Sequence, residues 1–357
     1  MTGAIKGRGA LSQPPGRFDK LTKEFESDGW YEEEAPNKIE TIVQAEQARS
    51  IITRNDSPDI GFSQSINPYR GCAHGCIYCY ARPSHAYVGL SPGLDFESKL
   101  FYKADAAQLL EQELSAPNYR CAPIMLGANT DPYQPLEKSL EVTRSLLEVL
   151  LKYKHPVNIT TKGALVARDV DLLSELAKDR LVQVMFSIPT LDDALKRLLE
   201  PRAASPGAKL RAMRMLADAG VPVGVLVAPI IPVLTEHEIE SVLEAARAAG
   251  ASLAGYTMLR LPWEVKDLFR EWLAEHFPER AAHVMSAVRG MRGGRDNDPD
   301  FGTRMHAIGP IAQLIRQRFQ LATRRLGFPS ERGFRLPTNL FRPPPRTNEQ
   351  LSLELPM

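Results

Sequence analysis

The sequence predicts an α/β protein with the architecture of an open, partial (β/α)6 barrel, flanked by an N-terminal extension and a helical, arginine-rich C-terminal region. Five runs rich in apolar and β-branched residues have the length of buried strands: residues 122–128, 156–161, 181–188, 221–230 and 252–259. Helical patterns separate them, so that strands recur about every 25 to 40 residues, which is typical of a parallel sheet with covered faces. A first strand just before Cys72 completes six β/α units, too few to close an eight-stranded barrel.

Composition divides the chain into four parts. Of its 357 residues 43% are hydrophobic and 24% charged, which is ordinary for a globular protein with a substantial core. Residues 1–60 are polar and predict a partly disordered extension, with ordered structure starting near Phe62. We expect a core domain over residues 61–262, a helical region over 263–328 and a proline-rich tail over 329–357.

Three helices between the strands carry clear signals. Residues 136–153 place leucine and valine side chains near one face, which predicts an amphipathic helix. Residues 206–220 open on a proline and end on a glycine, a good helix stop, and residues 235–250 repeat that form with acidic residues in the first turn. Because functional groups of β/α barrels gather at the carboxyl ends of the strands, polar residues at those ends are the candidate site.

Charge and cysteine content narrow the class of protein. No apolar run approaches the roughly 18 residues that span a bilayer, and the N-terminus lacks the apolar core of a signal peptide, so we expect a cytoplasmic protein. Four cysteines, three of them within eight residues, are too few and too clustered for a disulfide framework and predict metal or redox chemistry. The formal net charge is +1, but residues 289–346 contain twelve arginines and no lysine against four acidic residues.

The cysteine cluster has the spacing Cys72-x3-Cys76-x2-Cys79 and directly follows the first predicted strand. A structural zinc site usually takes four ligands, and the remaining cysteine, Cys121, lies 42 residues further along the chain. Three thiolates instead suit a [4Fe-4S] cluster with one iron left open.

The residues around the cysteines bear on the same choice. Gly71 and Gly75 permit the tight backbone that three converging sulfurs require. The alternative is a zinc site with His74 or His85 as fourth ligand.

With Tyr78 before its last cysteine, the C-x3-C-x2-C motif resembles that of the radical S-adenosylmethionine (radical SAM) superfamily, whose core is a TIM-like radical SAM barrel. Further segments, among them "GANTDPYQPLE", "ITTKG" and "GVPVGVLVAPIIPVLTEHEIE", are similar to the spore photoproduct lyase-like branch over residues 63–262. The resemblance implies a cluster whose open iron is chelated by SAM, an electron that cleaves the sulfonium, and a 5'-deoxyadenosyl radical that abstracts hydrogen from the substrate. It also implies a reductant such as flavodoxin or ferredoxin.

The resemblance assigns three residues to SAM directly. Tyr78 is similar to the aromatic residue beside the adenine, Lys162 to the lysine that meets the carboxylate, and Ser187 to the residue that bonds the ribose. A lysine at a strand end beside a cluster suits a charge-assisted hydrogen bond to a carboxylate. The alternatives are a solvated lysine and a serine that satisfies a backbone group.

Two further loops complete the assignment. Asn129, Thr130 and Asp131 fall where the resemblance places the SAM amino group, although the Thr and Asp also suit a turn or a helix cap. Glu200 and Arg202 contact SAM or form an ion pair that holds the fourth loop.

The sequence departs from spore photoproduct lyase in the loop after the second strand. That enzyme carries a cysteine there, which returns a hydrogen atom to the product radical, whereas this chain has "GANTDPYQ". Cys121 precedes the strand and is interpreted as a buried free cysteine at the other end of the barrel. Thymine-dimer repair by that route is therefore in doubt, and Tyr133 is the hydrogen donor that the loop offers.

The substrate stays open between hypotheses of different classes. Arginine, glycine and an aromatic residue in residues 289–304 favour a nucleic acid, as in DNA repair, unless the segment is a linker with internal Arg–Asp pairs. The alternatives are a radical SAM enzyme on a small molecule or protein, and a non-catalytic metal-binding module. Near the C-terminus, Gln350, Leu353 and Leu355 resemble the motif that docks on bacterial sliding clamps, unless the tail is an amphipathic segment that packs on the body.

Overall fold

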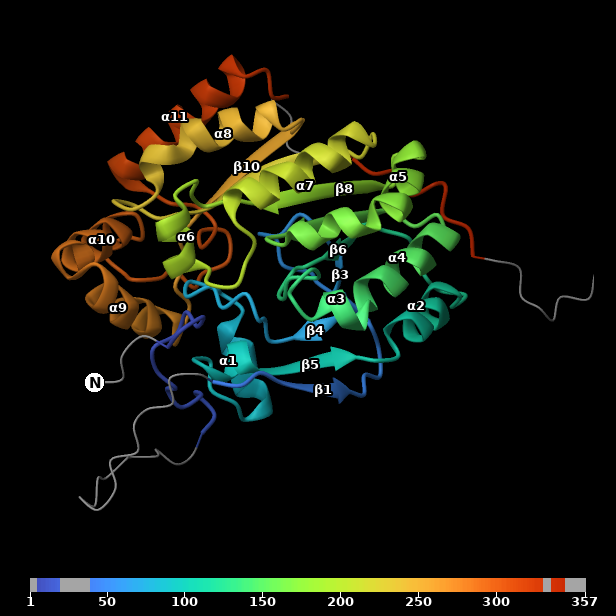
Figure 1. Cartoon of the computed structure of the whole chain (residues 1–357), viewed down its shortest axis with the longest axis horizontal. Coiled ribbons are helices and arrows are strands. Elements are labelled where there is room, and N and C mark those ends of the chain that lie inside the picture. Colours follow the sequence, from blue (N-terminus) through green and yellow to red (C-terminus); the bar gives the residue numbers. More distant parts are fainter. Residues whose placement is uncertain (1–4, 20–38, 330–334, 344–357) are drawn as a thin grey trace, which may run out of the picture.

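The computed structural model describes residues 5–19, 39–329 and 335–343, and its centre is a seven-stranded sheet in the order β10-β9-β8-β7-β6-β3-β2 (Figure 1). The strands are β2 (Ile52–Arg54), β3 (Gln64–Ile66), β6 (Ile124–Leu126), β7 (Val157–Thr161), β8 (Val182–Ser187), β9 (Val223–Ile230) and β10 (Leu253–Met258). From β3 to β10 neighbouring strands are parallel and follow chain order, and only β2 is antiparallel at the edge. The expected open, partial (β/α)6 barrel is confirmed.

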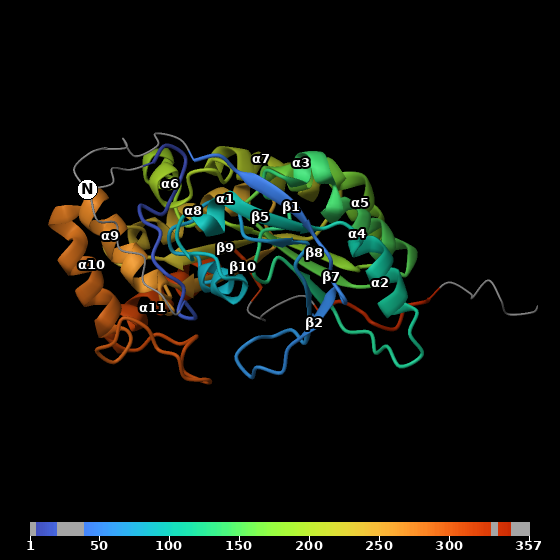
Figure 2. The same ribbon diagram turned by 90° about the horizontal axis from the view of Figure 1, so that it is seen from below.

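Helices cover the outer face of this sheet, as the crossover connections between its parallel strands require (Figures 1 and 2). They are α2 (Ala106–Leu114), α3 (Glu137–Leu140), α4 (Val142–Lys152), α5 (Val170–Lys178), α6 (Asp193–Leu199), α7 (Pro206–Asp218) and α8 (Ile239–Ala248), with short helical turns η1 (Arg82–Val88), η2 (Ala164–Asp169) and η3 (Glu236–Glu238). The strands bury residues on both faces: β8 buries Gln183 and Ser187 on one face and the apolar side chains of Val184 and Phe186 on the other. Each such side chain contributes about 1.5–3 kcal/mol of burial energy.

Two of the expected helices need comment. The helix expected over residues 136–153 is broken, because Glu141 adopts the left-handed conformation with a φ of 51° and separates α3 from α4. Helix α7 begins as expected at Pro206, and the Ser205 side chain accepts a hydrogen bond from the backbone N–H of Ala208, which satisfies an otherwise unpaired helix donor.

The N-terminal part is more ordered than expected. Ordered structure does not start near Phe62, because β1 (Ile42–Glu46) and β2 precede it and Ala10 is fully buried. Strand β1 belongs to a second sheet with β5 (Lys99–Lys103) and β4 (Tyr69–Arg70), in the order β1-β5-β4, and α1 (Asp95–Ser98) leads into β5. This small sheet lies beside the barrel (Figure 1).

Three helices follow the last strand: α9 (Val265–His276), α10 (Pro278–Gly290) and α11 (Gly309–Arg325). Helix α11 packs beside α8. Its Phe319 also contacts Tyr256 of β10, with 4.7 Å between the ring centroids. Helices α9 and α10 lie together at the end of the molecule that also holds α6 (Figures 1 and 2). Among the described residues, no helix has both the length and the apolar character needed to cross a membrane.

Candidate active site at the open end of the barrel

The cysteine loop leaves β4 and turns sharply before η1. Cys72 and Cys76 are buried and Cys79 is partly buried, and all three thiols are free. Gly71 and Gly75 take left-handed conformations with φ of 74° and 68°. A Cβ at Gly71 would lie 2.7 Å from a Leu100 methyl carbon, so the loop needs glycine there for space as well as for conformation.

The three thiols share one environment. Burial raises the pKa of Cys76 well above its usual value, and the charges of Glu200, Cys79 and Cys72 raise it further. Burial likewise raises the pKa of Cys79 to about 11, with Cys72 contributing. Cys76 and Cys79 resist ionisation in this environment and need a cationic centre to hold them as thiolates, and iron supplies one. The donor set therefore fits a cluster.

The zinc alternative finds no support in the described part of the chain. The His85 ring nitrogen Nε2 lies 2.9 Å from the Lys99 carbonyl oxygen, and burial lowers the pKa of this histidine. His74 Nδ1 lies 3.4 Å from Asp131; although burial lowers its pKa, Asp131 and Cys72 outweigh burial and raise it to about 9. Within the described residues, neither histidine joins the cysteines in a group arranged to hold a single metal ion.

A fully buried ion pair between Arg82 and Glu97 holds the cysteine loop in place. The guanidinium of Arg82 lies 2.5 Å from the Glu97 carboxylate and donates to the Cys76 carbonyl at 2.9 Å. The same carboxylate accepts hydrogen bonds from the backbone N–H groups of Gly9 and Ala10, at 2.9 and 2.8 Å. The N-terminal residues are thus tied to the cysteine loop through one carboxylate.

We call residues 5–19 the N-terminal strap. Arg8 in the strap donates to the Glu97 carbonyl at 2.7 Å, and the strap passes so close to the loop that a Cβ at Gly9 would overlap the Gly75 carbonyl oxygen. A Cβ at Gly93 would likewise overlap the Ser12 carbonyl. The sequence did not predict that the strap is ordered, because backbone contacts rather than an apolar pattern hold it.

A lysine–glutamate pair lies in the same space as the thiols. Lys162 directly follows β7, and its ammonium lies 2.5 Å from Ser187 Oγ at the end of β8 and 3.2 Å from the Glu200 carboxylate. The hydroxyl of Tyr78 donates to Glu200, whose other oxygen lies 2.9 Å from the Lys209 ammonium. The structure therefore brings Tyr78, Lys162, Ser187 and Glu200 together; Lys209 was not foreseen.

The charges of this group are mutually stabilised. Burial raises the pKa of Glu200, but Lys162 and Lys209 outweigh burial and hold that pKa well below its usual value. Burial lowers the pKa of Lys162, and Glu200 outweighs it and raises that pKa above its usual value. The Lys162 ammonium also lies 5.7 Å from the Tyr78 ring centroid. A permanent cation is therefore fixed at the ends of two adjacent strands.

The loop after β6 mostly supports this arrangement rather than facing it. Asn129 is exposed, while the Thr130 hydroxyl donates to the Tyr69 carbonyl at 2.8 Å, a contact between distant segments rather than the turn or cap named as its alternative. Asp131 accepts a hydrogen bond from the Lys162 backbone N–H at 2.6 Å. Asp131 thus fixes the strand end that carries the lysine.

Three residues named from the sequence lie elsewhere. Arg202 is exposed, and its guanidinium lies 3.2 Å from Thr41 Oγ1. Tyr133 is fully buried and its hydroxyl donates to Asp169 at 3.1 Å, which speaks against the hydrogen-donor role that we expected. Cys121 is a free thiol ahead of β6 and is partly rather than fully buried.

The arginine-rich segment 289–304 is largely committed to internal partners. Arg289 lies 2.8 Å from Asp296, Arg304 lies 2.7 Å from Asp59, and the buried Arg292 donates to backbone carbonyls. This is the internal pairing that the linker alternative foresaw.

The sliding-clamp-like residues Gln350, Leu353 and Leu355 lie outside the described residues. That resemblance therefore stays a sequence prediction.

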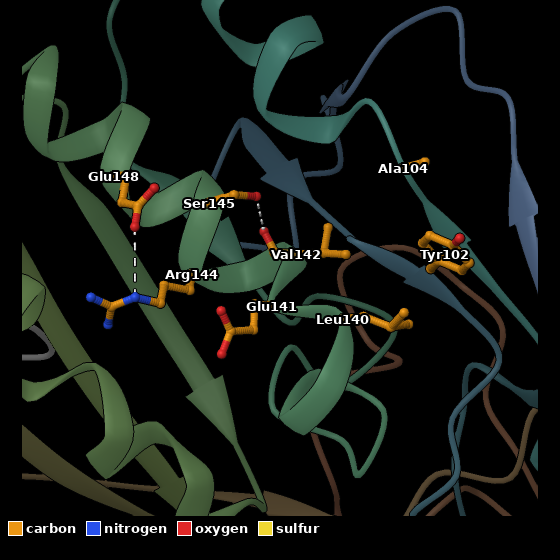
Figure 3. Close-up of a pocket in the computed structure, with 8 residues that line it drawn as sticks. All are labelled: Tyr102, Ala104, Leu140, Glu141, Val142, Arg144, Ser145 and Glu148. Atoms are coloured by element: carbon orange, nitrogen blue, oxygen red, sulfur yellow. Dashed lines mark hydrogen bonds and ion pairs between the residues drawn. The ribbon is translucent and has the colours of Figure 1, made fainter.

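A surface depression of about 360 Å3 lies between the end of β5 and the junction of α3 and α4 (Figure 3). Its polar groups are already paired: Arg144 lies 3.6 Å from Glu148, and Ser145 Oγ donates to the Val142 carbonyl at 2.8 Å. None of its lining residues belongs to the group around Lys162, so the depression has no part in the site.

A fixed cation at the carboxyl ends of the parallel strands β7 and β8, with free thiols and a buried carboxylate beside it, is typical of a cofactor-dependent barrel enzyme. Comparison with known proteins then gives the family: the family model described as "Radical SAM superfamily" matches residues 66–246. The chain belongs to the radical SAM superfamily. It is therefore a radical SAM enzyme, with a [4Fe-4S] cluster and SAM as its cofactors and a need for a reductant, and the non-catalytic metal-binding module is set aside.

Several proteins of similar sequence are described as uncharacterized. An uncharacterized protein of Mycobacterium bovis is 36% identical over 230 residues, which cover 64% of this chain and 68% of that protein. One of Mycobacterium tuberculosis gives the same values. An uncharacterized protein of Acidianus two-tailed virus is 31% identical over 172 residues, covering 47% and 56% of the two chains.

Among solved structures, spore photoproduct lyase complexed with dinucleoside spore photoproduct is similar, with a TM-score of 0.57 and 16% identity over 80% of this chain and 79% of that one. A mutant of that lyase with bound AdoMet and the dinucleoside photoproduct gives 0.55 and 17%, over 80% and 78%. At these identities the likeness shows a shared fold.

Proposed function

We propose that Cys72, Cys76 and Cys79 hold the [4Fe-4S] cluster, and that SAM binds beside them against Lys162 and Ser187. When bound, the two cofactors supply a 5'-deoxyadenosyl radical for hydrogen abstraction from the substrate. The chain's own task is to hold three thiolates on one side of a dry pocket and a hydrogen-bonding cation on the other.

The position of the Lys162 ammonium carries this proposal. It lies 2.5 Å from Ser187 Oγ and 3.2 Å from Glu200, and its charge acts on the Cys76 thiol. A carboxylate that enters beside the cysteines meets a permanent ammonium, already oriented, with which it forms a charge-assisted hydrogen bond.

Other residues named from the sequence position Lys162 or remain candidates for contact with SAM. Glu200 and Asp131 are positioning residues, because they hold the side chain and the backbone of Lys162 respectively. Tyr78 places its ring under the ammonium and is oriented by Glu200. Asn129 remains a candidate SAM contact because it is exposed, whereas Thr130 and Arg202 are engaged with other partners.

We propose a nucleic acid as the substrate class. The support is the fold shared with spore photoproduct lyase, whose solved complexes contain a dinucleoside photoproduct. Because the loop after β6 has no cysteine and Tyr133 is buried, a repair reaction that returns a hydrogen atom takes it from another group, in the chain or on the cofactor. A small-molecule or protein substrate is the alternative, and deuterium transfer from labelled candidates into 5'-deoxyadenosine decides between them.

The cluster assignment is tested by metal analysis of protein reconstituted with iron and sulfide without oxygen. Replacing Cys72, Cys76 and Cys79 with alanine should abolish iron binding and the visible absorption of the cluster. Cys121→Ala is the matched control and should retain both, since its thiol lies ahead of β6. Stoichiometric zinc without iron in protein made and handled anaerobically would refute the assignment.

The SAM assignment is tested with Lys162→Ala. Loss of a hydrogen bond between charged partners costs about 1.5–3 kcal/mol, so the affinity for SAM should fall by a factor of about 10 to 150. Equilibrium dialysis with labelled SAM measures the affinity, and the cluster spectrum should be unchanged. Lys152→Ala removes an exposed lysine paired with Glu111 and should leave SAM binding intact. Wild-type affinity in the Lys162 variant would contradict the proposal.

A further inference from the structure

Three exposed aromatic side chains from distant segments gather around one guanidinium. Phe18 of the strap, Tyr87 of η1 and Trp263 after β10 are exposed by 54%, 68% and 60%. The Arg17 guanidinium lies 5.3, 5.5 and 4.0 Å from their ring centroids, in that order. We call these four residues the Arg17 surface. Exposed aromatic residues gathered in this way are uncommon on a monomer and mark contact surfaces.

The backbone at Trp263 is strained in a way that favours this exposure. Its φ of 47° lies in the left-handed region, which costs a bulky residue about 1–2 kcal/mol. The residue gains little burial in return, because it is 60% exposed and its ring contacts mainly the Arg17 guanidinium. Strain that holds a large ring mostly in solvent is typical of a contact surface.

Charge at the Arg17 surface is nearly balanced. Glu264 lies 3.6 Å from the Arg17 guanidinium, so the pair contributes little net charge to the surface. Binding there depends on the faces of the rings rather than on an electrostatic field. Stacking on flat, uncharged ring systems is therefore the interaction that the Arg17 surface offers.

Within the described residues, a second cation on the same post-β10 segment forms no ion pair, although Asp59 and Asp298 lie close enough to act on its charge. Arg260 donates to the thioether sulfur of Met305 at 3.0 Å, and its buried Nε has no hydrogen-bond partner among the described residues. A thioether is a weak acceptor, and an unsatisfied guanidinium donor costs free energy. In contrast, nearby Arg304 is paired with Asp59, and Arg292 donates to backbone carbonyls.

Arg260 also adjoins the site. It lies two residues beyond the end of β10, at the same edge of the parallel sheet where Lys162 follows β7 and Ser187 ends β8. The Tyr80 ring is half exposed, and its hydroxyl donates to the Ala128 carbonyl in the loop after β6. An anion held by Arg260 would therefore lie at the edge of the space around the cysteines.

We propose that a single-stranded nucleic acid binds across this end of the barrel, with bases stacked on the Arg17 surface and a phosphate on Arg260. Aromatic rings that take base faces and a guanidinium that takes the backbone are the combination with which proteins hold single strands. The proposal rests on the proposed function and narrows its substrate class. It also moves the nucleic-acid contact away from residues 289–304, whose arginines are mostly paired internally.

The test uses fluorescence anisotropy of a fluorescein-labelled (dT)8 oligonucleotide with the cluster-loaded protein and SAM. The double variant Tyr87→Ala, Trp263→Ala should weaken binding at least tenfold, because one stacked base alone contributes about that much. Arg260→Met should also weaken binding, and it should lower the slope of log affinity against log salt by about 0.7, the value for one single-strand phosphate contact.

Matched controls separate these effects from general ones. Leu321→Ala removes a side chain that is 64% exposed on α11, and Arg295→Met removes an exposed arginine that lies 3.7 Å from Asp300. Both should leave oligonucleotide binding within about twofold of wild type, since neither residue belongs to the proposed surface. All variants should bind SAM normally, which also shows that they fold.

Three results would overturn the proposal. The first is absence of (dT)8 binding by wild-type protein, and the second is equal losses in the Arg260 and Arg295 variants. The third is a Tyr87, Trp263 variant that binds the oligonucleotide normally but accepts electrons from flavodoxin slowly, which would make the Arg17 surface a reductant-docking site. Loss of SAM binding in Lys162→Ala with oligonucleotide binding retained would separate the two proposals.

Discussion

Gly9 in the N-terminal strap offers the sharpest test of how the cysteine loop is held. A Cβ at this position would overlap the Gly75 carbonyl oxygen and would lie 3.3 Å from the Ile77 backbone nitrogen. Both are backbone atoms of the cysteine loop, so neither can move away as a flexible side chain would. Gly9→Ala should therefore push the strap and the loop apart.

The magnitude follows from the hydrogen bonds that this displacement breaks. Gly9 and Ala10 donate to the Glu97 carboxylate at 2.9 and 2.8 Å. A hydrogen bond to a charged group contributes about 1.5–3 kcal/mol, so losing one of the two favours strap opening by a factor of about 10 to 150. The seven-stranded sheet does not include the strap, and the fold should survive.

Two assays report the opening. With the cluster in place, the rate of iron loss to a strong chelator should rise by at least tenfold. In the metal-free protein, alkylation of Cys76 should accelerate by a similar factor. In the wild type this cysteine is only 5% exposed, and opening of the strap would expose it to the reagent. The second assay does not depend on the cluster assignment.

Gly61→Ala is the matched control, because a Cβ there meets no atom within 4 Å. It should leave both rates unchanged. Equal rates in the Gly9 and Gly61 variants would mean that the strap does not hold the loop, and the reasoning from the glycine contact would be wrong.

Two further predictions address the pH dependence and the tail. Burial lowers the pKa of His155 to about 4. Between about pH 6.5 and pH 4 the unfolded chain therefore binds a proton that the folded chain does not. Acidification through this range should lower the free energy of unfolding by about 3 kcal/mol, and the full stability should be present above pH 6.5. Urea unfolding across this range should show the loss in wild type and a flatter profile in His155→Gln; parallel profiles would contradict the shift. A peptide of residues 343–357 should bind bacterial sliding clamp in competition with a known clamp ligand, and alanine at Gln350 and Leu353 should abolish that binding. No binding at about 100 μM peptide, where a micromolar ligand is mostly bound, would leave the tail as an amphipathic segment.

The sheet could be predicted because its strands are buried on both faces. The run "VGVLVAPI" of β9 has few polar interruptions, and its neighbours have the same character, so length and spacing were enough. A first barrel strand was expected just before Cys72, but the strand there is β4 of the small sheet, and the barrel strand β3 lies ahead of it. Strand β3 has a mixed composition. It contains Gln64, which is buried because its side chain donates to the Arg120 carbonyl at 3.0 Å. Such a contact leaves no local pattern.

The candidate site was predictable only in part, and for a physical reason. Lys162 and Ser187 end apolar strands, where the barrel rule directs attention. Lys209 lies within the amphipathic helix α7 and has the sequence character of an ordinary surface lysine, yet it is fully buried against Glu200. Whether a helical lysine faces solvent or a buried carboxylate depends on tertiary packing, which a single sequence does not contain.

The strap escaped prediction for a related reason. The stretch "IKGRGALSQPPGRF" is rich in glycine and proline and poor in apolar residues, which is typical of a loose extension. Its order comes from glycine backbone packed on glycine backbone and from donors that reach Glu97. A segment with few apolar residues is expected to be disordered, and that expectation fails where a buried carboxylate accepts hydrogen bonds from its backbone N–H groups.

Buried carboxylates hold each loop of the site, and this explains how it can be in place before the cofactors arrive. Glu97 joins the cysteine loop to the strap, Asp131 fixes the backbone of Lys162, and Glu200 orients its ammonium. Each carboxylate already has donors or cations as partners, so none must be neutralised when SAM binds. Replacing Glu200 with Gln would leave Lys162 charged but free to rotate, and SAM affinity should fall even though Glu200 need not touch SAM. A loss as large as that of Lys162→Ala would show that the orientation of the ammonium matters as much as its charge.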